Sequence, residues 1–480
     1  MFGGYPIFFD LERGYQNVFN LISVSFLGPI NSLNFIFVCT YLIGFVSMSF
    51  LLQKLTKLNL WYSIILTVLY FYSHLSLSHV QHQNMLFSIF LLPTIILLSY
   101  LFVQNRRLLY IFCTILSYYF LITFGSLQTV IINVLFQSIF IIIISKNVKS
   151  GIVNILSLVT PSFVLTIPSI YYFFQMFQDS ERSVSGVSGQ GNLNLFHLGS
   201  YLLPFFLGSQ NYFGTTLDSD LLKQESLLYF SLSGFLSTIL YFSKRDTSGD
   251  NIFKKILGVT FLLFIILNVW VYFPFDIFRF WVRSSYILNF AIILFLADLL
   301  FKFSKDKVQN KLINYNVRYI LFFVFCLFLA TIASFVNKDY LFLFNTYLND
   351  YFFYIPIYLL IVLATLFIFF KYPRFLILVL LIDFSVSQTV HNFNLFLPKD
   401  ELISFTKQFN FYENTNDDYS LLKNGPSLSG YSGLVPKYKV EDNSWRAKYV
   451  LEDLIYFYIL STAVTLFYLY GIKRYVWKNH

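Results

Sequence analysis

The chain alternates long apolar segments with short polar gaps, and positive charge gathers at every second gap. Each apolar segment is about 17–25 residues long, which is the length an α-helix needs to cross a bilayer. Because Lys and Arg in short loops stay on the cytoplasmic side, this pattern predicts both the spans and their orientation. The basic gaps hold Lys54/Lys57, Arg106/Arg107, Lys146/Lys149, Lys244/Arg245/Lys254/Lys255, Lys302 to Lys311 with Arg318, Lys371/Arg374 and Lys473/Arg474/Lys478.

The pattern predicts an all-α polytopic membrane protein with about thirteen spans. Helices are favoured because the runs are continuously apolar, and a helix pairs every backbone polar group within its own segment. Comparison of the two halves reveals no internal repeat, which argues against an inverted-repeat transporter. The predicted spans are 33–52, 59–77, 85–103, 108–124, 127–144, 152–176, 226–243, 256–272, 284–301, 318–336, 351–370, 375–391 and 451–471.

Composition supports a lipid environment. Hydrophobic residues make up 57% of the chain and charged residues 12%, against roughly 25% charged residues in soluble domains. The basic gaps account for the net charge of +9, so the sequence gives no reason to expect a nucleic-acid partner. Cys39, Cys113 and Cys326 lie in apolar spans without CxxC spacing, which favours packing as small hydrophobic residues.

Four regions follow from the span pattern. Residues 1–32 form an outward N-terminal loop segment, and residues 33–391 form the helix bundle with a long outward loop at 178–225. Residues 392–450 mix basic and acidic side chains, which suits a small extracytoplasmic segment before the last helix. Residues 451–480 hold the last span and a basic cytoplasmic tail.

An outward turn rich in imidazole and amide groups precedes the third span. His79 and His82 stand three residues apart, so on a helix they share one face, and Gln83 follows directly. Such a pair can bind a metal ion, although no third ligand is evident in the sequence. It can equally hydrogen-bond a sugar or a phosphate, or form a polar turn in interfacial water.

Two further outward turns carry candidate polar groups. Gly125 and Ser126 precede Gln128, which indicates either a plain tight turn or a close helix approach beside a binding amide. Arg279 and Arg283 are i,i+4 neighbours in a short aromatic turn that also contains Asp276. Outward arginines run against the orientation rule and suit a lipid-linked phosphate. The alternative is an ion pair that fixes an interfacial helix.

Two carboxylates fall inside predicted spans. Asp298 stands four residues before Lys302, so a local ion pair accounts for it. Asp383 lies near the middle of the span 375–391, and its partner is not visible in the sequence. Intramembrane carboxylates are functional candidates by default, although structural acids with satisfied hydrogen bonds are also common.

The order of these features resembles the YfhO-like membrane proteins over most of the chain. Each motif is short, and their order carries the likeness. The motifs are Gly3-Gly4-Tyr5-Pro6, Gly14, Pro29-Ile-Asn31, the His/Gln/Asn turn before Leu92-Pro93, Gly125-Ser-Leu-Gln128, Leu202-Leu-Pro204, Gly208, Tyr212-Phe213-Gly214, Tyr229, Arg279-Phe-Trp-Val-Arg283, Ile382-Asp383-Phe, and Asn414 with Gly430-Tyr431-Ser432.

YfhO-like proteins resemble GT-C glycosyltransferases, and this likeness implies a function. Such enzymes transfer sugar from a polyprenyl-phosphate donor to an envelope polymer, such as a teichoic acid, outside the bacterial cytoplasmic membrane. An acid in the first outward loop serves as base or metal ligand, because an acceptor hydroxyl needs its proton removed. Basic residues hold the donor phosphate. The resemblance thus implies a GT-C-like bundle, with a divalent metal as a possible cofactor.

The N-terminus departs from the family pattern. Family members begin with a transmembrane helix and an acid at its outer end, whereas this chain starts at Met1-Phe-Gly-Gly, which leaves Asp10 and Glu12 as the candidate acids. We therefore expect a missing first helix and weak or absent transferase activity. Two other classes stay open: a transporter or flippase of lipid-linked saccharides, and a non-catalytic membrane scaffold.

Overall fold

The computed structural model describes residues 17–73, 76, 83–178, 229, 231–243, 252–269, 284–305, 354–390 and 451–478, and within these ranges the regular structure is helical throughout. The elements are α1 (Val18–Leu27), α2 (Pro29–Thr56), α3 (Leu60–Phe71), α5 (Gln83–Asn105), α6 (Leu108–Phe124), α7 (Leu127–Ile144), α8 (Val148–Gln178), α9 (Leu232–Ser243), α10 (Ile252–Val269), α11 (Ser285–Lys305), α14 (Tyr354–Lys371), the 3₁₀ turn η9 (Pro373–Phe375), α15 (Leu376–Val390) and α18 (Leu451–Lys478).

Each predicted span coincides with one of these helices, except 318–336, which lies outside the described residues. Five helices are long and apolar enough to cross a membrane by length and composition: Asn34–Thr56, Asn84–Asn105, Leu127–Ile144, Val148–Gln175 and Ser285–Phe303. The other apolar helices among the described residues are shorter, so the number of thirteen spans stays a prediction. The chain is therefore a helical membrane protein.

The N-terminal boundary differs from the prediction. Residues 18–27, which we expected within an outward loop segment, form α1, and α2 begins at Pro29 instead of residue 33. Asn17 caps α1 by accepting hydrogen bonds from the backbone of Phe19 and Asn20 at 3.0 and 3.3 Å. Gly28 then takes a φ of 75°, which a glycine adopts without strain, and Pro29 starts α2. A cap and a turn residue thus divide one apolar stretch into two helices.

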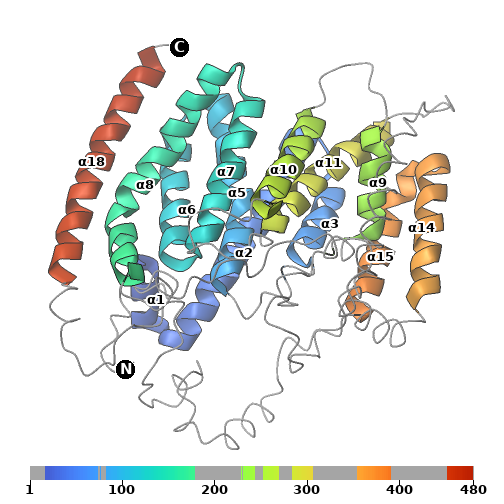
Figure 1. Cartoon of the computed structure of the whole chain (residues 1–480), viewed down its shortest axis with the longest axis horizontal. Coiled ribbons are helices and arrows are strands. Elements are labelled where there is room, and N and C mark those ends of the chain that lie inside the picture. Colours follow the sequence, from blue (N-terminus) through green and yellow to red (C-terminus); the bar gives the residue numbers. More distant parts are fainter. Residues whose placement is uncertain are drawn as a thin grey trace, which may run out of the picture.

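Neighbouring helices run in the directions that the charge pattern requires (Figure 1). The helices α2 and α5 are parallel, since Phe37 lies against Phe87 and Thr94 donates a hydrogen bond to Ser47. At one edge of the bundle, α18 packs antiparallel to α8; Tyr468 there donates to the carbonyl of Leu156. At the opposite edge, α14 packs beside α9 and α15.

All Lys and Arg residues of the described ranges therefore lie at one end of the bundle, here called the basic end. It is the upper end in Figure 1, where α18 finishes. Arg106 there has a φ of 55° and donates a hydrogen bond to Asn154 of α8, and its guanidinium lies 5.3 Å from the ring centre of Phe102. Partial burial lowers the pKa of Arg106. Which end faces the cytoplasm stays a prediction.

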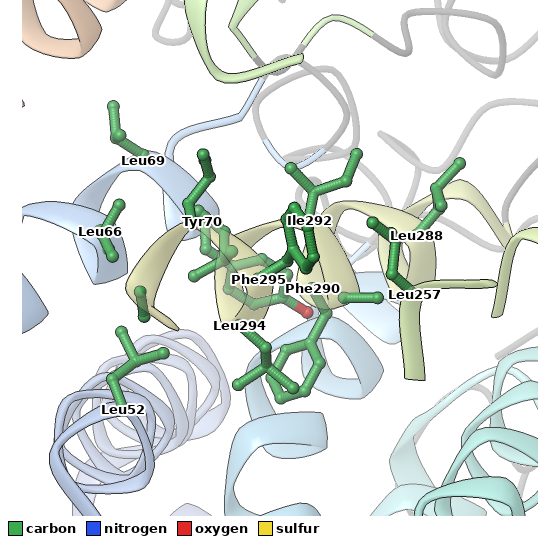
Figure 2. Close-up of a cluster of buried hydrophobic side chains, with 14 of the residues drawn as sticks. Leu52, Leu66, Leu69, Tyr70, Leu257, Leu288, Phe290, Ile292, Leu294 and Phe295 are labelled. Atoms are coloured by element: carbon green, nitrogen blue, oxygen red, sulfur yellow. The ribbon is translucent and has the colours of Figure 1, made fainter. Parts of the chain in front are cut away.

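The core is organised around α11. In this helix 89% of the candidate span is buried, against 44% in α2, so α11 is enclosed by protein on nearly all sides while α2 has an outer face. Figure 2 shows Tyr70 of α3 close to Phe290 of α11, and their ring centres are 5.5 Å apart in an edge-to-face arrangement. Phe136 of α7 meets Phe290 in the same way at 5.5 Å. These rings join three helices around the first turns of α11.

Candidate functional site

Most of the side chains that the sequence singled out lie beyond the part of the chain that the structure describes. This set comprises Asp10, Glu12, His79, His82, Asp276, Arg279 and Arg283. Gln83 is the first residue of α5, while Gln128 near the start of α7 and Asp383 within α15 have described side chains. The site can therefore be built from the helix starts that adjoin the predicted residues.

Hydrogen bonds join the first turns of α5, α7 and α11. The Oγ of Ser88 lies 2.6 Å from Oγ1 of Thr129, and Asn133 Nδ2 donates to the carbonyl of Ser88 at 3.2 Å. Tyr286 Oη donates to Asn133 Oδ1 at 2.7 Å and lies 3.1 Å from the carbonyl of Thr129. We call these four buried residues the polar tetrad. It binds three helix starts together at the end opposite the basic end.

Gly125 explains how α5 and α7 come so close. A Cβ placed there would meet Ser88 Oγ at 3.2 Å and would overlap the carbonyl oxygen of Leu121. Both alternatives that the sequence left open therefore apply. Gly125 forms the tight turn between α6 and α7, and its missing side chain lets α5 approach closely. In the turn, the Ser126 carbonyl accepts a 2.8 Å hydrogen bond from Thr129 Oγ1.

Several buried polar atoms near these helix starts make no hydrogen bond among the residues that the structure describes. They are Nε2 of Gln128, Oγ of Ser285 and both amide atoms of Asn289. Gln128 is 5% exposed and Asn289 1% exposed. Leaving a buried polar group unpaired costs about 1–3 kcal/mol, so such groups call for a bound water or a polar ligand. Amides and a hydroxyl suit a ligand that is rich in hydroxyl groups.

A polar stripe continues from the tetrad down one face of α7 and then stops. Gln137 accepts a 2.7 Å hydrogen bond from Tyr118 and donates a 2.8 Å hydrogen bond to Ser99. Toward the basic end, α7 continues with Phe140 and Ile141, both fully buried. The buried polar side chains of α7 thus reach no farther toward the basic end than Gln137.

Asp383 has a full set of partners that the sequence did not reveal. Its carboxyl group accepts hydrogen bonds from Tyr229 Oη, Ser231 Oγ at 2.7 Å, Ser233 N at 2.7 Å and Ser233 Oγ at 2.8 Å. Ser231 and Ser233 flank the first residue of α9, so the carboxyl group caps the start of that helix. Because the donors lie about 150 residues earlier in the chain, no local pattern points to them. The arrangement is that of a structural acid that fastens α15 to α9.

Asp298 confirms the local prediction. Its Oδ2 lies 2.8 Å from Lys302 Nζ one helical turn later. The Lys302 ammonium group also lies 5.4 Å from the ring centre of Tyr241 in α9. This acid therefore neutralises a lysine at the basic end and is not placed with the polar tetrad.

Within the described ranges, no three His, Cys, Asp or Glu side chains gather to form a metal site. The predicted acid and histidine ligands lie outside those ranges, so a divalent metal stays a prediction.

No family model matches the chain, and neither does any curated protein or solved structure. The YfhO-like resemblance therefore stays a prediction, and the function has to be argued from the site.

Proposed function

We propose that this chain is a membrane glycosyltransferase. It would take a sugar from a polyprenyl-phosphate donor and attach it to an envelope polymer at the end of the bundle opposite the basic end. The polar tetrad carries this proposal, because Ser88, Thr129, Asn133 and Tyr286 bring together the starts of α5, α7 and α11. Each of these starts adjoins residues that the sequence predicted for the site.

The donor phosphate is the group that this arrangement suits best. A helix start presents free backbone N–H groups and the positive end of the helix dipole, both of which favour an anion. Arg283 stands two residues before the first residue of α11, and Arg279 four residues earlier. We assign the donor phosphate to these two guanidinium groups, which can bind its oxygens through charge-assisted hydrogen bonds.

Sugar or acceptor hydroxyl groups would be held by neutral polar side chains. Gln128, Ser285 and Asn289 stand within three residues of a tetrad residue in the sequence and offer donors and acceptors that no described residue pairs. His79 and His82 precede α5 by a few residues, and we assign them to the same ligand with Gln83. We assign the role of base to Asp10 or Glu12 in the first segment, and we assign Asp276 to the binding of sugar or acceptor.

The polar groups favour transfer over transport. A transporter needs a polar path that reaches both ends of the bundle, whereas the polar stripe of α7 ends at Gln137 and gives way to Phe140 and Ile141. The buried Asp383 is held by four hydrogen bonds and so serves as a structural fastening instead of an ion carrier.

The test is a transfer assay on the full chain in proteoliposomes. Polyprenyl-phosphate carrying a radiolabelled hexose is supplied with isolated envelope polymer, and polymer-bound label is counted. Arg283→Ala should lower kcat/KM about 10- to 100-fold, since a charge-assisted hydrogen bond contributes about 1.5–3 kcal/mol. Gln128→Leu should lower it about 10-fold, equivalent to about 1.4 kcal/mol, because it removes an amide N–H group that has no partner among the described residues.

Arg107→Ala is the matched control, since Arg107 lies at the basic end and its side chain caps no helix. Normal turnover in Arg283→Ala would contradict the phosphate assignment. Movement of the labelled lipid across the membrane without label on the polymer would replace the transferase by a flippase. The absence of both transfer and lipid movement would point to the scaffold class.

A further inference from the structure

The short helix α1 has its polar side chains toward the protein and its apolar side chains exposed, the opposite of a surface helix in a water-soluble protein. Asn20 and Ser23 face the protein and are 8% exposed, whereas Phe19, Ile22 and Phe26 are 50%, 52% and 82% exposed. Surface helices in water show the reverse arrangement, with apolar residues inward and polar residues outward. The helix therefore presents its apolar face to its surroundings.

The polar face of α1 is fastened by hydrogen bonds to two other helices. Asn17 Nδ2 donates to Thr123 Oγ1 of α6 at 2.7 Å, and the backbone N of Val18 donates to Tyr119 Oη at 3.2 Å. On the other side, Ser32 of α2 donates to Asn20 Oδ1 at 3.2 Å. The orientation of α1 is thus fixed by its buried polar groups, which leaves the apolar face outward.

The helix α2, which packs against α1, also has an exposed apolar face. The exposed residues of α2 include Phe35, Val38, Leu42, Val46 and Phe50, each about half exposed. They recur three or four residues apart, so they form one stripe along the helix. The candidate membrane span of α2 begins at Asn34 and contains this stripe.

The length of α1 decides how it can lie in a membrane. Ten residues of helix extend about 15 Å, half of the hydrocarbon thickness of about 30 Å. Its partner residues Tyr119 and Thr123 belong to the last turns of α6, at the end opposite the basic end. At that end Gly28 turns the chain from α1 into α2.

We propose that α1 is a membrane-embedded half-helix. Its exposed face, formed by Phe19, Ile22 and Phe26, is covered by the hydrocarbon of the leaflet at the end opposite the basic end. The buried Asn17, Asn20 and Ser23 let it sit there, because each finds a hydrogen bond within the protein and none has to face lipid. The chain therefore has a membrane contact on this side in addition to its spans, independent of any transferase activity.

Spin labels along α1 test this. Single cysteines replace Ile22, Phe26 and Ser23 in the full chain, after Cys39, Cys113 and Cys326 have been changed to alanine, and each carries a nitroxide. The labelled chains are reconstituted in phosphatidylcholine–phosphatidylglycerol vesicles. Collision rates are then measured with oxygen, which concentrates in hydrocarbon, and with a water-soluble nickel chelate. Labels at Leu42 and Arg107 provide the lipid and water references.

Labels at Ile22 and Phe26 should collide with oxygen at least about threefold more often than the label at Arg107, and should match Leu42. The label at Ser23 should be shielded from both reagents. Nickel collisions at Ile22 and Phe26 equal to those at Arg107 would overturn the proposal in favour of a water-exposed helix. Shielding of both positions from both reagents would overturn it in favour of a protein cover, such as a second copy. Unchanged far-ultraviolet circular dichroism verifies that each labelled variant is folded.

Discussion

Replacing Asp383 by alanine should loosen the start of α9. The carboxyl group is the acceptor for four donors from three residues, Tyr229, Ser231 and Ser233. After the replacement, the two serine hydroxyls can still bond each other, since they lie 3.0 Å apart. The Tyr229 hydroxyl loses the carboxyl group as a partner, and the backbone N–H of Ser233 loses its acceptor and stays buried.

The cost follows from the Ser233 N–H. A buried donor left without an acceptor costs about 1–3 kcal/mol, so the replacement should cost about that much. Asp383→Asn keeps one oxygen that can still accept a hydrogen bond, but an NH2 group, which only donates, replaces the other accepting oxygen. The asparagine variant should therefore fall between the wild type and Asp383→Ala.

Hydrogen exchange followed by mass spectrometry in detergent micelles measures the effect where it arises. A loss of about 1–3 kcal/mol corresponds to exchange that is about 5- to 150-fold faster in the peptide that contains Ser233. Thermal unfolding of the same variants should show a lower midpoint, with Asp383→Ala below Asp383→Asn.

Ser385→Ala is the matched control on the same helix. Ser385 is exposed and its hydroxyl bonds only to the Leu381 carbonyl within α15. If Asp383→Ala exchanged and melted like Ser385→Ala, the carboxyl group would not fasten α15 to α9. Faster exchange spread over all helices would show global unfolding and would also contradict a local role.

Two further predictions concern helix packing. Gly44→Ala should lower the unfolding free energy by about 1–3 kcal/mol, because a Cβ on Gly44 would overlap the backbone carbonyl of Phe90. Gly258→Ala is the control and should not lower it, because a Cβ there would meet no atom within 4 Å. Thermal unfolding in micelles compares the two, and equal midpoints would refute the close approach of α2 and α5. Tyr286→Phe should cost about 1–2 kcal/mol in the same assay, since Asn133 Oδ1 loses its donor, while the exposed Tyr372→Phe should be neutral.

The helices themselves could be predicted from the sequence. Long apolar runs separated by basic gaps predicted the positions of α5, α6 and α7 to within a few residues. The reason is that helix formation and burial depend on neighbours along the chain. The ion pair between Asp298 and Lys302 was predictable on the same ground, because its two residues stand one turn apart.

The helix α1 was missed because its signal is weak in the sequence. Its ten residues are too few for a span, and Asn20 and Ser23 interrupt the apolar run. In a soluble protein these residues would mark the outer face, so the pattern alone gives the wrong side. The contacts of Asn17 with Thr123 show which face is buried.

The sequence by itself determined that this chain forms apolar helices with their positive charge at alternate gaps. Only the tertiary structure decided which polar residues meet. Tyr229 reaches Asp383 across more than 150 residues, and Tyr286 reaches Asn133 across a similar separation. Helix formation is governed by near neighbours, whereas the partner of a buried polar group depends on which helix faces touch. That choice is made when the helices pack, and it leaves no local mark in the sequence.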